Sequence, residues 1–364
     1  MMMVIMALIL SIFDYQIDVV MSSGSIRLGF LGSDLVATSA AKLAAYDCNA
    51  TLFRDDIDVH LVNFDPNLDA WKAQQGYCDA LHLEGIHMMV GPESSAKSSS
   101  IAHFASNLKI PTISYFATAP SLINGNFFAR NVLDDTKQAQ VMIDFIKFQN
   151  WTTYCLISEN TNYGAEASIA TEQYGMSNRM RLLFSRVYSP VTNITNLLNE
   201  AESVSCRIFV LWCSQSNPNT NCVDIMNEAN KLNMLEDGRY VWIMGDGAYS
   251  NSNLWQDNEL RRAMIGTFAI LPAVFPSQNK TNFENRIKDI DNTITNIPQQ
   301  AYFAYDAVYF SCMTLKLVRD DIGFIPPTYN ITSTNRNDTC IPSMIVPSDL
   351  YEYKYGSTIY DITI

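Results

Sequence analysis

One stretch of the sequence, residues 87–115, limits the folds that this chain can adopt more than any other. It reads HMMVGPESSAKSSSIAHFASNLKIPTISY. The apolar run 87–90 suits a buried strand, and Gly91-Pro92 ends it because proline has no N–H to donate to a neighbouring strand. Residues 93–95 carry side-chain oxygens typical of a helix start, and apolar residues then recur at helical spacing. The next proline ends that helix, and a second strand, 112–115, follows. This order predicts an α/β fold.

The turn before this helix is a candidate anion site. The free N–H groups at a helix N-terminus and the positive end of the helix dipole favour a carboxylate or a phosphate. Ser95 adds a hydroxyl group at the same place. The alternative is an ordinary capped helix, in which the serine only satisfies backbone N–H groups.

The rest of the chain alternates strands and helices in two runs, which predicts two α/β lobes, each with a parallel sheet covered on both faces. Two lobes suit 364 residues better than one very large sheet. Beyond residue 321 the chain is rich in Pro, Asn, Ser and Thr and is expected to be mostly loop. Outside 87–115, strands are expected at 27–31, 59–64, 127–133, 153–158, 182–188, 207–212, 240–244 and 266–273. Helices are expected in the Ala-rich stretch from 35 to about 46, near 68–83, 137–149, 196–204, 222–234, 283–290 and 301–318, and one more begins within 159–167.

Composition and motifs exclude several functions. The net charge is −13 and no basic cluster occurs, so binding to nucleic acid or to anionic lipid is not expected. The cysteines form no C-x-x-C and do not group with the four histidines, so no metal site is expected. The sequence GFLGSD lacks the dinucleotide-binding glycine spacing, and we expect no cofactor. No hydrolase, metalloprotease or phosphate-loop signature occurs, so the chain is not expected to be an enzyme.

Three features favour secretion. The apolar start of segment 1–25 is too short to span a bilayer and suits a signal peptide, although no basic residue precedes it. The alternative is an irregular first strand of a cytosolic protein. After residue 25 no apolar run is long enough to cross a membrane. The eight cysteines suit disulfides, and six N-x-S/T sequons are candidate glycosylation sites: Asn49, Asn150, Asn193, Asn279, Asn330 and Asn337.

The cysteine pairing is open from the sequence. We expect Cys48–Cys78 and Cys213–Cys222 if the chain is secreted. Cys155, Cys206 and Cys312 stand among apolar neighbours and are expected to be buried free thiols.

Several segments together resemble a known family. They are VGPESSAKSSSIAHFASNLKIPTISYFATAPSL, FFARNVLDDTKQAQVMIDFIKFQNWTTYCLISENTNYG and YVWIMGDG. They resemble the extracellular Venus-flytrap ligand-binding domains of periplasmic-binding-protein type I fold, in the same order, over about 27–318. The style is that of class C G-protein-coupled receptors of the metabotropic glutamate type. The segment from Cys206 to Ile243 is similar to receptor guanylate cyclases of the natriuretic-peptide-receptor type.

The resemblance implies an architecture. Lobe 1 would comprise 26–129 and 272–330, and lobe 2 would comprise 130–271. The two lobes would close over a ligand, and 331–364 would be a C-terminal tail that is short for the family. Dimerisation through lobe 1 is also implied.

The resemblance also implies a set of ligand-binding residues. Ser95 matches the serine that binds the ligand carboxylate, and Thr118 matches a threonine that contacts both carboxylate and amine. Asp135 and Asp246 match acids that face the ligand ammonium group, and Tyr163 matches an aromatic residue that packs over the ligand. Singly, each has another explanation: Ser95 and Asp135 as helix caps, Tyr163 and Asp246 as turn residues.

Departures from the family pattern bear on the ligand. Phe116 stands where many glutamate receptors have a small polar residue. Ala37 stands where they have a base that meets the distal carboxylate, and Lys42 is the only base nearby. A neutral or smaller amino acid is therefore expected in place of glutamate. Glu93-Ser94 stands where natriuretic-type receptors have a cysteine.

The expected function is thus that of an extracellular, cell-surface receptor domain that binds an amino-acid-like ligand. A membrane attachment would come only from a segment outside this chain. The alternative is the ectodomain of a receptor guanylate cyclase that binds a peptide or an unknown ligand. A solute-binding protein of a transporter would share the fold, but six sequons suit a secreted eukaryotic chain better.

Overall fold

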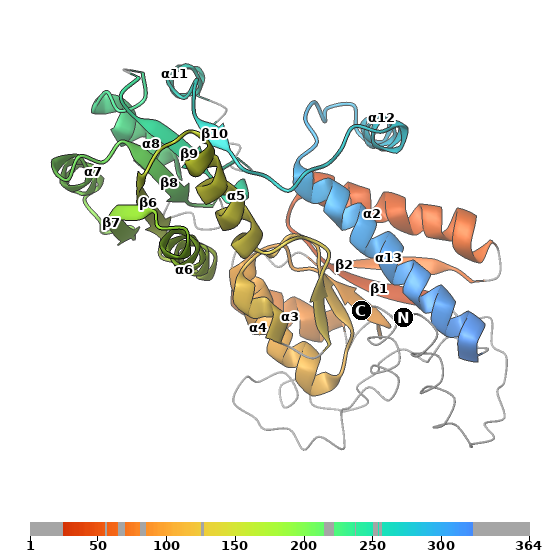
Figure 1. Cartoon of the computed structure of the whole chain (residues 1–364). Coiled ribbons are helices and arrows are strands. Elements are labelled where there is room, and N and C mark those ends of the chain that lie inside the picture. The colour runs from red at the N-terminus through yellow and green to blue at the C-terminus, as the bar shows by residue number, and fades with distance from the viewer. Residues whose placement is uncertain are drawn as a thin grey trace.

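The computed structural model describes residues 25–54, 57–64, 70–80, 85–124, 127–214, 222–236, 238–249, 254 and 257–322. These residues form two parallel sheets, each flanked by helices, in two lobes (Figure 1). The α/β, two-lobed fold expected from the sequence is therefore confirmed.

The first lobe is built on a sheet with the strand order β2-β1-β3-β4-β5. Every neighbouring pair is parallel, as expected when helices connect successive strands. Its strands are β1 (Ile26–Leu31), β2 (Val59–Phe64), β3 (Met88–Val90), β4 (Thr112–Ser114) and β5 (Phe128–Arg130), and its connecting helices are α2 (Leu35–Asp47), α3 (Ala70–Asp79) and α4 (Ser95–Leu108).

The second lobe repeats this plan with the strand order β10-β9-β8-β6-β7. Alternate residues of β8 face opposite helical layers: Phe209 and Leu211 join one core cluster, and Val210 and Trp212 join the other. A sheet covered on both faces explains why its strands at 208–212 and 241–244 are wholly apolar. The strands are β6 (Thr153–Glu159), β7 (Arg181–Tyr188), β8 (Ile208–Trp212), β9 (Val241–Met244) and β10 (Phe268–Ala269), and the helices are α5 (Asp135–Phe148), α6 (Asn162–Ser177), α7 (Ile194–Ser203), α8 (Cys222–Lys231), α9 (Asp246–Tyr249) and α11 (Asn258–Ala263).

The chain then returns to the first lobe through α12 (Gln278–Ile290) and α13 (Gln299–Ile322) (Figure 1). Helix α13 packs along α2, where Ala41 and Ala44 share a core cluster with Ala304 and Val308. Small side chains let the two helices approach closely. The last strand is shorter than the expected 266–273, and α12 begins before residue 283 because Ser277 caps it.

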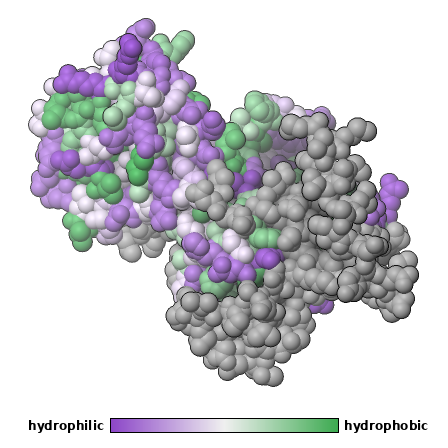
Figure 2. Space-filling model, turned by 60° about the horizontal axis from the view of Figure 1, so that its bottom comes forward, coloured by the Kyte–Doolittle hydropathy of each residue, from purple (hydrophilic) through white to green (hydrophobic). Residues whose placement is uncertain are grey.

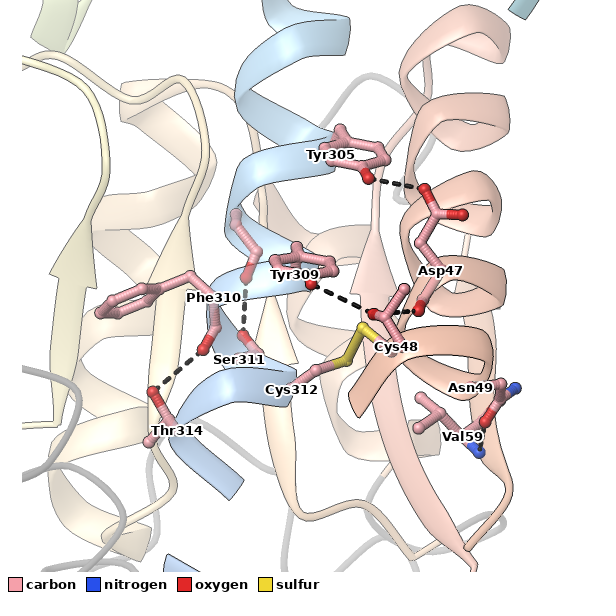
Figure 3. Close-up of a disulfide and its surroundings, with 12 residues drawn as sticks. Asp47, Cys48, Asn49, Val59, Tyr305, Tyr309, Phe310, Ser311, Cys312 and Thr314 are labelled. Carbon is pink, nitrogen blue, oxygen red and sulfur yellow. Dashed lines mark hydrogen bonds between the residues drawn. A yellow bond between two sulfur atoms is a disulfide. The ribbon is translucent and has the colours of Figure 1, made fainter. Parts of the chain in front are cut away.

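The cysteine pairing corrects two predictions. Cys48 pairs with Cys312, not with Cys78, because α13 returns beside the end of α2 and brings the two Cα atoms to 6.2 Å (Figure 3). Cys155 pairs with Cys206, so these two residues and Cys312 are not free thiols. The expected pair Cys213–Cys222 is present.

Several sequence predictions concern the chain ends and its surface. Of segment 1–25 only Ser25 is described, and the tail 331–364, with Asn337, lies outside the described residues, as does Asn330. Among the other sequon asparagines, Asn150, Asn193 and Asn279 are exposed. Asn49 is partly buried, and its side chain bonds the backbone of Val59 in both directions. Glycosylation at all six positions stays a prediction.

No helix within the described part of the chain combines the length and apolar character needed to cross a bilayer.

Over the part of the second lobe that faces the viewer in Figure 2, hydrophobic residues form small groups that are interspersed with hydrophilic residues. We propose that the chain passes to the second lobe after β5, the last strand of the first sheet, and returns after β10, the last described strand of the second sheet. The expected boundary 129/130 falls inside β5, one residue before its end, and 271/272 lies two residues after β10.

Candidate functional site

A cavity of about 300 Å³ is lined by residues of both lobes. The first lobe contributes the turns that follow β1 and β3 and the loop that follows β4. The second lobe contributes the start of α6 and the turns after β8 and β9. All these segments follow the carboxyl ends of parallel strands, which is where α/β sheets bind ligands.

Four of the five predicted ligand-binding residues line this cavity: Ser95, Thr118, Tyr163 and Asp246. The fifth, Asp135, is completely buried behind them, and its backbone N–H donates to the carbonyl oxygen of Thr118 at 2.9 Å. Residues up to 151 positions apart in the sequence (Ser95 and Asp246) therefore meet in one place.

Ser95 is not the cap of its helix. The N-cap of α4 is Ser94, whose Oγ accepts from the backbone N–H of Lys97. The Ser95 Oγ instead accepts from the N–H groups of Thr118, at 3.2 Å, and Ala119, at 3.0 Å. A serine oxygen that accepts two bonds keeps its own O–H proton for another acceptor. Ser95 thus holds the Thr118 loop against α4 and still has a donor for a ligand.

Asp246 is fixed from three directions. Its Oδ1 accepts from the Tyr163 hydroxyl and from the Gly247 N–H, both at 2.9 Å, and its own N–H donates to Gln138 at 3.2 Å. Burial raises the pKa of Asp246, and these hydrogen bonds act in the opposite direction. The glycine is required here, because a Cβ at Gly247 would lie 2.9 Å from the Tyr163 ring.

The carboxylate of Asp135 has fewer hydrogen-bond partners than that of Asp246. The cap of α5 is Asp134, which accepts from the Thr136 N–H, so Asp135 is not an N-cap. The Oδ2 of Asp135 has no hydrogen-bond partner among the described residues. Burial, and then the charge of Asp246, raise the pKa of Asp135 well above its usual value, against smaller effects from Thr118 and Arg130.

Neither acid forms an ion pair with a basic residue in the described ranges. Arg130, whose charge reaches Asp135, donates instead to the carbonyl oxygens of Ala117 and Ala119 and pairs with Asp134 at 3.5 Å. Two neighbouring buried carboxylates without a paired cation are electrostatically costly. A bound cation would relieve that cost, so this side of the cavity is chemically suited to an ammonium group.

Besides Ser95 and Thr118, the first lobe places further polar residues at the cavity that were not predicted as site residues. Glu93 accepts from the Ser33 hydroxyl at 2.8 Å and pairs with Lys97 at 2.8 Å, and Asp34 lies beside them in the cavity wall. Ser33 and Asp34 closely follow β1, and Glu93 closely follows β3. Their position beyond the carboxyl ends of parallel strands was the signal that could have identified them.

The structure also shows where the residues that depart from the family pattern lie. Phe116 lines the cavity and packs on Phe303, with ring centroids 5.9 Å apart. Ala37 is fully buried inside the first lobe, and Lys42 is exposed. Lys97, not Lys42, is the base at the cavity wall.

The described residues contain no group of three or more His, Cys, Asp or Glu arranged to hold a metal ion. The polar side chains that line the cavity carry carboxylates, hydroxyl groups, the Lys97 ammonium and the Gln300 amide, and they come from both lobes. Together the fold and this site define a two-lobed binding protein of the periplasmic-binding-protein type.

Solved structures share this fold. A leucine complex of an ABC transporter substrate-binding protein from Desulfitobacterium hafniense superposes with a TM-score of 0.64. The match covers 80% of this chain and 84% of that one at 16% identity. At this identity the likeness shows the fold alone.

The chain belongs to the family described as "receptor family ligand binding region". The model of this family matches residues 36–344. It is 24% identical to glutamate receptor 3.7 of Arabidopsis thaliana over 288 residues, which are 76% of this chain and 30% of the relative. It is 26% identical to metabotropic glutamate receptor-like protein E of Dictyostelium discoideum over 247 residues, 64% of this chain and 29% of the relative. The chain thus spans about 30% of the length of these relatives.

Proposed function

We propose that this chain is the extracellular ligand-binding domain of a cell-surface receptor and that it binds a small amino-acid-like ligand between its lobes. The observation that carries the proposal is the meeting of Ser95 and Thr118 of the first lobe with Tyr163 and Asp246 of the second around one cavity. A zwitterion needs anion donors and cation acceptors on opposite sides, and this arrangement supplies both.

Each end of the ligand has a chemical partner. The ligand carboxylate would lie at the N-terminus of α4, where backbone N–H groups and the Ser95 hydroxyl donate. The ligand ammonium would lie near Asp246 and the Tyr163 ring, with Asp135 behind them. A volume of about 300 Å³ suits a ligand of this size.

Closure of the lobes would carry the signal. The ligand contacts both lobes, so it favours the closed arrangement by the contacts that only that arrangement provides. Hydrogen bonds already join α6 to the first lobe: Ser121 donates to Glu166 through its N–H at 2.8 Å and its hydroxyl at 2.7 Å, and Asn162 donates to Ser99 at 3.1 Å. They place α6 against the first lobe and make it the element through which closure would act.

The proposal has two further parts. The first is attachment to a membrane through a segment outside this chain, and the second is dimerisation through the first lobe. The names of the relatives support the first part. Leu35 and Tyr46, which are exposed on α2 by 83% and 67%, support the second, because exposed apolar side chains favour contact with another surface. Light scattering on the purified chain measures its oligomeric state.

The test of the ligand class is thermal unfolding of the secreted chain in the presence of each of the twenty amino acids. A ligand that binds only the folded chain raises the unfolding midpoint with the logarithm of its concentration. The same titration is run on Asp246→Asn, which keeps an acceptor for Tyr163 and Gly247 but removes the charge. Asp224→Asn, an exposed acid on α8, is the matched control.

We expect at least one amino acid to raise the midpoint of the native chain and of Asp224→Asn, and the shift to be lost in Asp246→Asn. If no amino acid raises the midpoint of the native chain, the amino-acid proposal is wrong. If the shift survives in Asp246→Asn, the ligand binds elsewhere.

A further inference from the structure

The cavity wall carries more negative than positive charge. Three acids line it, Asp34, Glu93 and Asp246, and Asp135 is buried behind Thr118. Among the described residues Lys97 is the only base that lines it. With all groups in their usual charge states, the lining carries a charge of −2, and Asp135 adds to it.

The one base is already neutralised. The Lys97 ammonium lies 2.8 Å from the Glu93 Oε1, and Glu93 is held in place by the Ser33 hydroxyl. Only 6% of the Lys97 side chain and 14% of the Glu93 side chain are exposed, so solvent screens this pair weakly. Lys97 is therefore a poor partner for an acidic group of a ligand.

Asp34 is the acid of the first lobe that stays uncompensated. Its Oδ1 caps α2 by accepting the Ala37 N–H at 2.7 Å, and no ion pair reaches it from the described residues. The end of a helix dipole is equivalent to about half an elementary charge, so it offsets Asp34 only in part. The Asp34 carboxylate is thus an acceptor on the first lobe, while Asp135 and Asp246 are acceptors on the second.

We propose that the ligand carries two cationic groups: a basic amino acid whose α-ammonium binds at Asp246 and whose side-chain cation binds at Asp34. This inference rests on the proposed function and names the ligand class of the same site. The ligand carboxylate keeps its place at the N-terminus of α4. Phe116, which also lines the cavity, offers an apolar face to the methylene chain of the ligand.

Charge excludes the acidic alternative. Glutamate would add another carboxylate to a wall that already holds three, and its side chain would find Lys97 occupied by Glu93. A neutral amino acid satisfies Asp246 but leaves Asp34 without a partner. A diamino acid adds one opposite charge at each unpaired acid, so it lowers the repulsion on both lobes.

The test is a titration by isothermal calorimetry with pairs of ligands of matched shape. Lysine is compared with norleucine, which lacks only the side-chain amine, and glutamate is the acidic comparison. The series 2,3-diaminopropionate, 2,4-diaminobutyrate, ornithine and lysine varies the distance between the two cations. Each titration is repeated on Asp34→Asn, which keeps the capping oxygen of α2, and on Asp257→Asn, which makes the same change at the cap of α11.

The expected result is that the best diamino acid binds about tenfold or more tightly than norleucine, as one added charge-assisted hydrogen bond predicts. Affinity should pass through a maximum along the chain-length series. The Kd ratio of norleucine to lysine should fall several-fold in Asp34→Asn and stay unchanged in Asp257→Asn.

Three outcomes contradict the inference, and they differ in what else they contradict. If neutral or acidic amino acids bind as tightly as any diamino acid, the inference fails and the amino-acid site stands. If no amino acid binds at all, the proposed function fails with it. If the diamino acids bind best but Asp34→Asn keeps the full ratio, the placement of the side-chain cation at Asp34 is wrong.

Discussion

The two lobes hold their polar groups at the cavity in different ways. In the first lobe Glu93 is paired with Lys97, and Ser95 accepts from two backbone N–H groups. In the second lobe Asp135 and Asp246 lie buried without a paired base among the described residues, and burial raises the pKa of both. Apart from Asp34, the polar groups of the first lobe are therefore satisfied before a ligand arrives, whereas the second lobe holds two buried acids that a ligand cation would stabilise.

This difference suggests a division of work. A rigid, satisfied surface positions the ligand with little reorganisation, and this lowers the entropic cost of binding. A surface with uncompensated charge makes binding selective, because only a cation relieves it. In a two-lobed protein, the same charge also gives the ligand its differential affinity for the closed arrangement.

The lobes also differ in how disulfides tie them, and the largest effect is expected there. Cys48–Cys312 joins residues 264 positions apart in the first lobe, whereas Cys213–Cys222 joins residues nine apart in the second. Loop-closure entropy predicts that Cys48→Ala/Cys312→Ala lowers the free energy of unfolding by about 5–6 kcal/mol, and Cys213→Ala/Cys222→Ala by about 2–3 kcal/mol. Urea unfolding of both double variants measures the two losses, and equal losses would contradict the loop-length argument.

The second-largest effect is expected from the loss of Ser95 in the first lobe. Ser95→Ala removes the acceptor of two backbone N–H groups in the first lobe, which should lower the free energy of unfolding by about 1–3 kcal/mol. Ser94→Ala, next to it, removes only the helix cap and should cost about 1 kcal/mol. Chemical denaturation gives both values, and titration of a bound amino acid should show lost affinity mainly in Ser95→Ala. An equal loss of affinity in both variants would mean that Ser95 acts only through the stability of α4.

A third prediction separates a functional acid from a structural one. Asp135→Asn removes a buried charge, so the unliganded chain should unfold at a higher temperature than the native chain. Affinity for an amino-acid ligand should fall several-fold, because a negative charge behind the ammonium site is lost. Asp144→Asn, an exposed acid on the same helix, is the control for both measurements. A lower midpoint together with unchanged affinity would assign Asp135 to the fold and not to the site.

The sequence predicted most of the fold because local signals agreed with one another. The strand predicted at 59–64 has the same bounds as β2, and the strand predicted to begin at 153 begins where β6 does. Turn and capping residues mark these ends in the sequence. The pairing of Cys48 with Cys312 was missed because it depends on the return of α13 across the fold. No local pattern records such a contact.

The site was predicted only in part for a similar reason. Motif resemblance identified Ser95, Thr118, Tyr163 and Asp246, which share the cavity. Asp34, Glu93 and Lys97 were not identified as site residues, because in sequence they look like ordinary helix-start residues. Their role at the wall follows from the parallel order of β1 and β3, which puts both turns at the same edge.

The smallest expected effect is the number of protons that are released when the ligand binds. This number tests the second lobe directly. Because the folded pKa of Asp135 and Asp246 is raised, the folded chain holds more protons than the unfolded chain between the usual and the raised value. The contribution of this pair to the free energy of unfolding therefore falls as the pH rises through that window. A cationic ligand binds the ionised pair, so its affinity should rise with pH over the same window, and binding should release up to about one proton. Calorimetry in two buffers of different ionisation enthalpy measures that number, and it should fall towards zero in Asp135→Asn. Proton uptake in place of release would mean that the ligand binds the protonated pair, and the charge difference between the lobes would then have no part in recognition.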